Sequence, residues 1–209
     1  MTPERFIDLT EPFVHGENIA VALQDDLPVY LGHECYAYDL AIKSHTGTYF
    51  ETSSHVFRDG KDTDSWSASD VMMKACVIRF SAEKEGAIDV PELQEKMGTD
   101  RTAGQSPFFP GDALLVATSG RRDRHFTREA AEWMVQHGVR LLGAELDRYD
   151  TGFVNPTGFF IPLFKAEIPI VANLANWDRL PEGRCRLLVV PLLVRGVCTV
   201  PARVIAILE

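Results

Sequence analysis

Short apolar runs, each bounded by glycine, proline or polar residues, recur along the chain and limit the folds that it can adopt. They lie at residues 6–10, 75–80, 111–120, 139–143, 168–171, 187–192 and 202–208. Runs of this length with turn residues at both ends are typical of buried β-strands. Residues 36–50, which are rich in Tyr, Ile and Thr, predict a further strand or hairpin.

Three short helices are expected between these strands. The clearest covers residues 128–137, because Thr127 can cap its first turn and Gly138 can take the left-handed position at its end. Residues 90–98 and 159–165 predict the other two. Many strands with few helices indicate a mixed α/β fold. No linker or internal repeat interrupts the 209 residues, so we expect a single domain over 1–209.

The charge balance excludes some partners. The chain carries 30 acidic and 21 basic side chains, a net charge of −9. Nucleic acids and anionic membrane surfaces attract basic proteins, so neither is an expected partner. No stretch of about 18 apolar residues predicts a membrane span. The N-terminus does not resemble a secretory signal and none of the four cysteines forms a CxxC pair, so we expect a cytoplasmic protein with reduced thiols.

One polar segment, residues 44–55, concentrates groups that can do chemistry. His45, Tyr49, Glu51 and His55 are all odd-numbered. Side chains of a strand alternate between its faces, so if the strand continues, at least the first three point the same way. Burying such groups without partners would be costly. The spacing alone leaves two interpretations open, a functional site and a solvated strand face.

This segment resembles a degenerate form of the H-x-G-T-H-x-D-x-P-x-H signature of a family of cyclases, bacterial kynurenine formamidases and isatin hydrolases. The resemblance continues along nearly the whole chain, and the weaker matches fall in the family's order. They are Ile7–Thr10, His55–Gly60, Gly111 with Asp112, Gly143–Glu145 with Asp150, Ile168–Leu174, and Arg195 with Gly196, Pro201 and Arg203.

The resemblance implies a swivelling β/β/α architecture with a mixed sheet in one domain, assembled as a homodimer or higher homo-oligomer. It also implies one or two divalent metals that activate water for attack on an amide or similar carbonyl. The chain departs from that pattern. Tyr49 stands in place of the second His, Glu51 in place of the Asp, and Ala172 in place of a later Glu. A further family His falls near Phe160.

These departures remove most of the family's metal ligands, so we predict no metal cofactor. A single Zn or Mn on His45 and Glu51 is the alternative, with His33 or Glu34 as a replacement ligand. A zinc site needs about three protein ligands and a water.

The remaining groups suit general acid/base catalysis. We expect His55 to be the main proton-transfer residue, Glu51 its partner or the base, Tyr49 an oxyanion donor and His45 a supporting polar group. The expected reaction is cyclisation, dehydration or isomerisation of a small aromatic or polyketide-like carbonyl compound. A metal-dependent amidohydrolase with one rebuilt metal site and a non-catalytic member of the fold are the alternatives.

Aromatic residues surround the signature and offer candidates for a substrate pocket. Trp66, Phe50, Phe57 and Phe160 are expected to line it. Core packing is the competing interpretation for the same rings.

Overall fold

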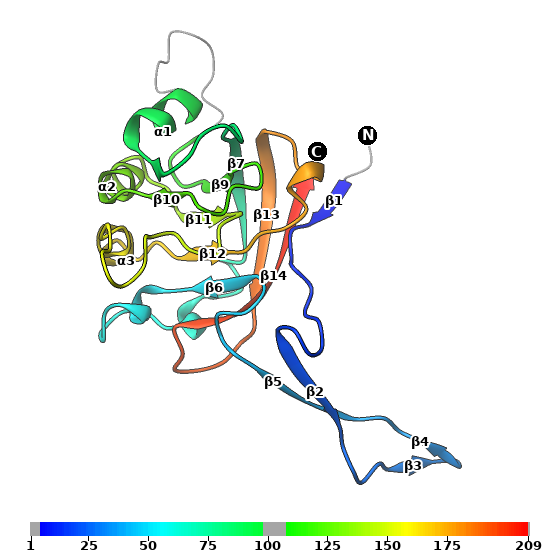
Figure 1. The fold of residues 1–209 in the computed structure, drawn as a ribbon. Helices are drawn as coiled ribbons and strands as arrows, with labels where there is room; N and C mark the ends of the chain where they lie inside the picture. The colour runs from blue at the N-terminus through cyan, green and yellow to red at the C-terminus, as the bar shows by residue number, and fades with distance from the viewer. Residues whose placement is uncertain (1–4, 98–107, 209) are drawn as a thin grey trace.

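A mixed eight-stranded sheet dominates the computed structural model, which describes residues 5–97 and 108–208. The strands follow the order β1-β14-β13-β7-β9-β11-β12-β6, and an additional β14–β6 pairing closes all of them except β1 into a barrel (Figure 1). Their bounds are β1 Arg5–Asp8, β6 Tyr49–Glu51, β7 Met72–Arg79, β9 Ala113–Ala117, β11 Leu141–Ala144, β12 Ile170–Ala172, β13 Gly183–Pro191 and β14 Thr199–Leu208. The predicted mixed α/β class is confirmed.

Three helices pack along one side of the barrel, beside its parallel strands (Figure 1). They are α1 Val90–Met97, α2 Arg128–Gln136 and α3 Phe160–Lys165. Neighbouring strands among β7, β9, β11 and β12 pair in parallel, which requires crossover connections on the sheet surface. The predicted cap of α2 is present, because the Thr127 hydroxyl accepts a hydrogen bond of 3.1 Å from the backbone N–H of Ala130.

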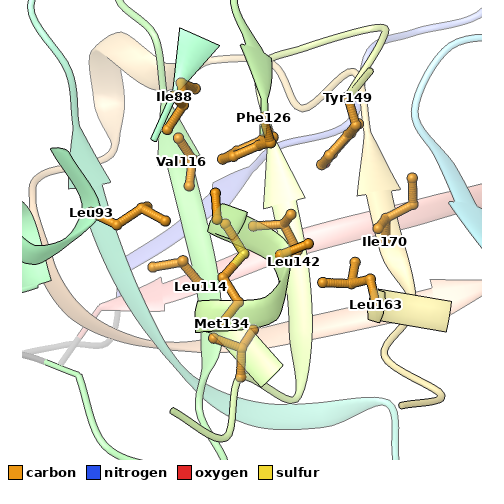
Figure 2. Close-up of a cluster of buried hydrophobic side chains, with 14 of the residues drawn as sticks. Ile88, Leu93, Leu114, Val116, Phe126, Met134, Leu142, Tyr149, Leu163 and Ile170 are labelled. Carbon is orange, nitrogen blue, oxygen red and sulfur yellow. The ribbon is translucent and has the colours of Figure 1, made fainter. Parts of the chain in front are cut away.

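Strand alternation produces two hydrophobic cores. On β9, Leu114 and Val116 face the helices, where they pack in the cluster drawn in Figure 2. Leu115 faces the barrel interior instead. Gly143 on β11 has to be a glycine, since a Cβ there would lie 2.7 Å from Leu115 Cδ2 and 2.9 Å from Leu174 Cδ1.

The remaining elements are short. A hairpin arm of β2 Ile19–Leu23, β3 Val29–Tyr30, β4 His33–Glu34 and β5 Tyr38–Ile42 extends away from the barrel (Figure 1). β8 Ala87–Ile88 pairs in parallel with β10 His125–Phe126. Three 3-10 helices, η1 Ser53–His55, η2 Thr63–Ser65 and η3 Trp177–Arg179, complete the elements of the described residues. Over residues 5–97 and 108–208, no helix has the length and apolarity needed to cross a membrane.

Candidate active site

Strand β6 places a polar pair on the helix-facing side of the barrel wall. Tyr49 and Glu51 point to that side, while Phe50 between them points into the barrel. β6 is hydrogen-bonded on both edges, to β12 and to β14. Only 2% of the Glu51 surface is exposed. The sheet therefore holds a carboxylate rigidly in a largely dry setting.

Two histidines converge on this carboxylate from irregular segments. His45 Nε2 lies 3.2 Å from Glu51 Oε2, and His55 Nε2 lies 3.6 Å from Glu51 Oε1. The two imidazole centroids are 5.2 Å apart. The carboxylate thus presents one oxygen to each imidazole.

The condition that one strand continues through all of these residues is not met. β5 ends at Ile42, a bend carries His45, β6 covers only Tyr49–Glu51, and His55 ends the 3-10 helix η1. Gly47 in the bend has a φ of +59°, which a glycine adopts without strain. The odd-numbered residues therefore meet because the chain turns around Glu51, while alternation accounts only for Tyr49 and Glu51.

Cys198, which precedes β14, and Thr199, which begins it, lie beside the histidines. Thr199 Oγ1 lies 3.3 Å from His45 Nε2, and Cys198 Sγ lies 3.8 Å from His55 Nδ1. Ser44 Oγ lies 3.0 Å from the other ring nitrogen of His45. Sequence reasoning missed Cys198 and Thr199, because only the long-range pairing of β14 with β6 brings them to the site.

The Tyr49 hydroxyl already donates a hydrogen bond within the protein. The hydroxyl donates a hydrogen bond of 3.2 Å to the backbone carbonyl of Asp147. Burial raises the pKa of Tyr49 well above its usual value, and the negative charges of Glu51 and Asp147 raise it further. The phenol therefore stays neutral, and it would have to release the Asp147 carbonyl before it could donate to an oxyanion. The oxyanion role stays a prediction.

A cavity of 810 Å³ opens beside the cluster. His45, Tyr49, Glu51 and His55 all line it, together with Phe160, whose ring centroid is 6.4 Å from that of His55. The rest of the lining is mainly apolar with three charged residues, and includes Val56, Asp147, Arg148, Asp150, Phe153, Pro156 and Ile161. Such a volume holds a small molecule, with the polar groups gathered at one wall.

Three of the four aromatic residues expected around the substrate lie elsewhere. Phe50 is fully buried in the barrel, because its even-numbered position on β6 turns it away from the cavity. Trp66 packs on Phe50 with ring centroids 5.0 Å apart and lines a separate cavity of 170 Å³. Phe57 packs against the helix-side core. The placement of these three rings supports core packing, and Phe160 alone fits the expected position.

The cluster also fits a single divalent metal ion. His45, Glu51 and His55 each offer a ligand atom, and these atoms lie within 4.8 Å of one another. Glu51 Oε1 is buried with no hydrogen-bond partner. Two imidazoles and a carboxylate form a donor set known for zinc. The sequence indicated only His45 and Glu51 as remaining ligands, and the turn of the chain adds His55.

A second metal ion has no comparable ligand set in the described part of the chain. Ala172, at the position of the family's later Glu, pairs with Tyr49 across β12 and β6 and offers only a methyl group. His33 and Glu34, the suggested replacements, lie exposed on β4 in the arm and do not join the cluster. Their proposed role as ligands in this chain's own site is therefore wrong.

The overall fold is that of a group of solved hydrolase structures. Isatin hydrolase A from Ralstonia solanacearum superposes with a TM-score of 0.78 at 21% identity, covering 99% of this chain and 92% of that one. A structure described as a potential metal-dependent hydrolase with cyclase activity gives a TM-score of 0.76 at 18% identity, covering 98% of both chains. At these identities the likeness shows the fold alone.

The family of this chain is shown by its sequence. Residues 7–151 match the family described as "Putative cyclase", and the chain belongs to that family. The match includes the whole of the 44–55 segment. None of the curated proteins matches the chain.

Proposed function

We propose that the protein is an enzyme that moves protons at the carbonyl group of a small, largely apolar molecule, with Glu51 and its two histidines as the reaction centre. The observation that carries the proposal is a buried carboxylate with one oxygen toward each imidazole, at the wall of an 810 Å³ cavity. Family membership supports an enzyme of the cyclase or hydrolase type.

The environment suits each group to a different task. Glu51 is shielded from water, so its carboxylate can take a proton from a substrate carbon or from an attacking hydroxyl with little competition from solvent. His55 faces both the cavity and Glu51, and can pass that proton on. His45, with a side chain 42% exposed, connects the cluster to solvent. A protonated imidazole beside the substrate oxygen would stabilise the negative charge that develops there.

A metal-dependent hydrolase is the second candidate, and it is favoured by Glu51 Oε1, which is buried without a hydrogen-bond partner. His45, Glu51 and His55 would hold the ion. When bound, such an ion polarises a carbonyl and lowers the pKa of a water molecule. His45 and His55 would then serve as ligands, and proton transfer would fall to other groups of the cavity.

Metal analysis combined with one variant tests both candidates. The purified protein, prepared without chelator, is analysed for bound Zn and Mn, and turnover of small aromatic amides, lactams and enolisable ketones is measured before and after chelation. Turnover by metal-free protein supports acid/base catalysis, whereas a stoichiometric ion and loss of turnover on chelation support the hydrolase. Equal turnover by wild type and Glu51→Gln would overturn both.

A further inference from the structure

A second cavity, of 480 Å³, lies where the parallel strands of the sheet end. Arg79 is the last residue of β7, Ser119 follows the end of β9, and Glu145 follows the end of β11. Residues 174–178, which come after β12, form another part of the lining. In α/β proteins, ligands characteristically bind outside the carboxyl ends of the parallel strands. This cavity shares no lining residue with the cavity at Glu51.

Hydrogen bonds fix one wall of this second cavity. The Glu145 carboxylate accepts three of them, from the backbone N–H of Thr118 at 2.8 Å, from the Thr118 hydroxyl at 3.2 Å and from the backbone N–H of Gly120 at 3.0 Å. Ser119 has a φ of +53°, and Asn176 in the facing segment has a φ of +56°. Residues other than glycine rarely adopt this left-handed conformation, and those that do cluster at functional sites. The turn after β9 is therefore held in a defined shape at the cavity wall.

Two arginines bring positive charge to the cavity without a carboxylate partner among the described residues. The Arg79 guanidinium donates hydrogen bonds of 2.7 and 3.0 Å to the backbone carbonyls of Trp177 and Leu180. Arg122 also lines the cavity and is unpaired within the described ranges, although its neighbour Arg121 forms ion pairs. Neutral carbonyls fix the position of the Arg79 guanidinium and leave its charge uncompensated. Such a group favours an anionic ligand.

Two carboxylates face the same cavity without a cation. Glu11 and Asp178 line it, and in the part of the chain that the structure describes neither pairs with Arg79, Arg122 or any other basic side chain. Glu145, by contrast, is already satisfied by its three hydrogen bonds. Charges of both signs therefore line one cavity and do not meet. A ligand that carries one charge of each sign would compensate both sets.

We propose that this second cavity binds a free α-amino acid, with its carboxylate on Arg79 and Arg122 and its ammonium group on Glu11 and Asp178. An α-amino acid is the simplest small molecule that presents both charges at a fixed separation. The cavity volume lies within the range of small-molecule sites. Trp177 adds an apolar surface on which the side chain of the amino acid can lie.

Titration of the full chain with amino acids and their one-charge analogues tests the proposal. Isothermal titration calorimetry is carried out with glycine, L-leucine and L-glutamine. Each amino acid is compared with the corresponding amine, which lacks the carboxylate, and with the corresponding carboxylic acid, which lacks the ammonium group. We expect saturable binding of at least one amino acid, with an affinity at least about 10-fold higher than that of either analogue.

Two variants locate the binding and separate the two charges. Arg122 and Asp178 are exposed and have no partner in the described ranges, so their substitution should leave the fold intact. Arg122→Gln should weaken binding of the amino acid and of its carboxylic acid by about 10-fold and leave the amine unchanged. Asp178→Asn should weaken the amino acid and the amine instead. Arg121→Gln is the matched control and should change none of these affinities.

Three results would each overturn the proposal. They are no saturable binding of any of the three amino acids, equal affinity for an amino acid and its one-charge analogues, and unchanged affinity in Arg122→Gln. Binding that Glu51→Gln abolishes and Arg122→Gln preserves would place the ligand at the candidate active site and would also overturn it. The measurement involves no turnover, so its failure and the failure of the proposed function are distinguishable.

Discussion

Strand β6 and the hairpin arm both depart from the usual distribution of side chains, in which polar groups face water and apolar groups are buried. β6 buries a carboxylate that lacks a hydrogen-bond partner on one oxygen, and the arm exposes apolar side chains that lack a cover. Both arrangements cost free energy in the isolated chain. A buried carboxylate of this kind is what the reaction centre proposed above would require, and the cost of the exposed apolar ribbon would fall if another surface covered it. The contrast separates a polar group buried at the wall of a cavity from an apolar ribbon exposed to solvent.

The largest effect is expected when the negative charge of Glu51 on β6 is removed. Glu51→Gln keeps the shape of the side chain and removes the proton acceptor, so we expect turnover to fall by about 10²–10⁴-fold. Steady-state kinetics measures the effect. Glu34→Gln, at an exposed position in the arm, is the control and should leave turnover unchanged. An unchanged rate in Glu51→Gln would place the chemistry elsewhere.

The next prediction concerns Phe50, the neighbour of Glu51 on β6. Phe50→Ala removes a fully buried ring from the barrel and should lower the free energy of unfolding by about 3–5 kcal/mol. Urea denaturation measures it. At concentrations of denaturant where the variant remains folded, its KM should match the wild type, since Phe50 does not line the cavity. A raised KM with normal stability would instead support the original expectation that Phe50 contacts substrate.

Tyr49→Phe should have a smaller effect on stability. It removes the hydrogen bond to the Asp147 carbonyl, so we expect a loss of about 1 kcal/mol together with slightly altered packing of the cavity wall. Turnover distinguishes two roles for the hydroxyl. A fall of about 10²-fold or more in kcat would indicate that the hydroxyl leaves Asp147 to stabilise an oxyanion, and an unchanged kcat would refute that role.

The smallest effect is expected in the arm, at low protein concentration. Leu40→Ala changes an exposed side chain and should alter the unfolding free energy of a monomer by no more than about 0.5 kcal/mol. If the homo-oligomer that the family resemblance implies uses the arm, the wild type should gain stability at higher concentration and the variant should gain less. Thermal melts over a wide concentration range measure the difference. Melting points that are independent of concentration in both proteins would contradict it.

Local patterns in the sequence predicted the elements that local interactions determine. Buried strands such as β9 follow from apolar runs, and the capped start of α2 follows from Thr127. The residue types of His45, Glu51 and His55 left a functional site and a solvated strand face open, and the resemblance to the family signature favoured the site. The path of the backbone through this cluster could not be predicted, because the same residue spacing occurs in a continuous strand and in a chain that turns around Glu51.

The errors arose where distant segments decide the environment. Phe50 was expected at the substrate because it lies within the signature, yet alternation on β6 turns it into the barrel. Cys198 and Thr199 carried no signal, since only strand pairing places them at the histidines. The arm was only partly anticipated by residues 36–50, because an uncovered apolar ribbon has no local signature that separates it from a core strand.

The closure of the barrel by β6 and β14 has a consequence for folding. Thr199 and His45 lie 154 residues apart in the chain yet meet at the site. Contacts of such long range carry a large loop-closure entropy and tend to form late. The parallel strands β7, β9, β11 and β12 and their helices make contacts between segments that are closer in the sequence. The contacts of Thr199 and Cys198 with the histidines form only after β14, the last strand, has paired with β6. Competence for chemistry should therefore be among the last properties that the folding chain acquires.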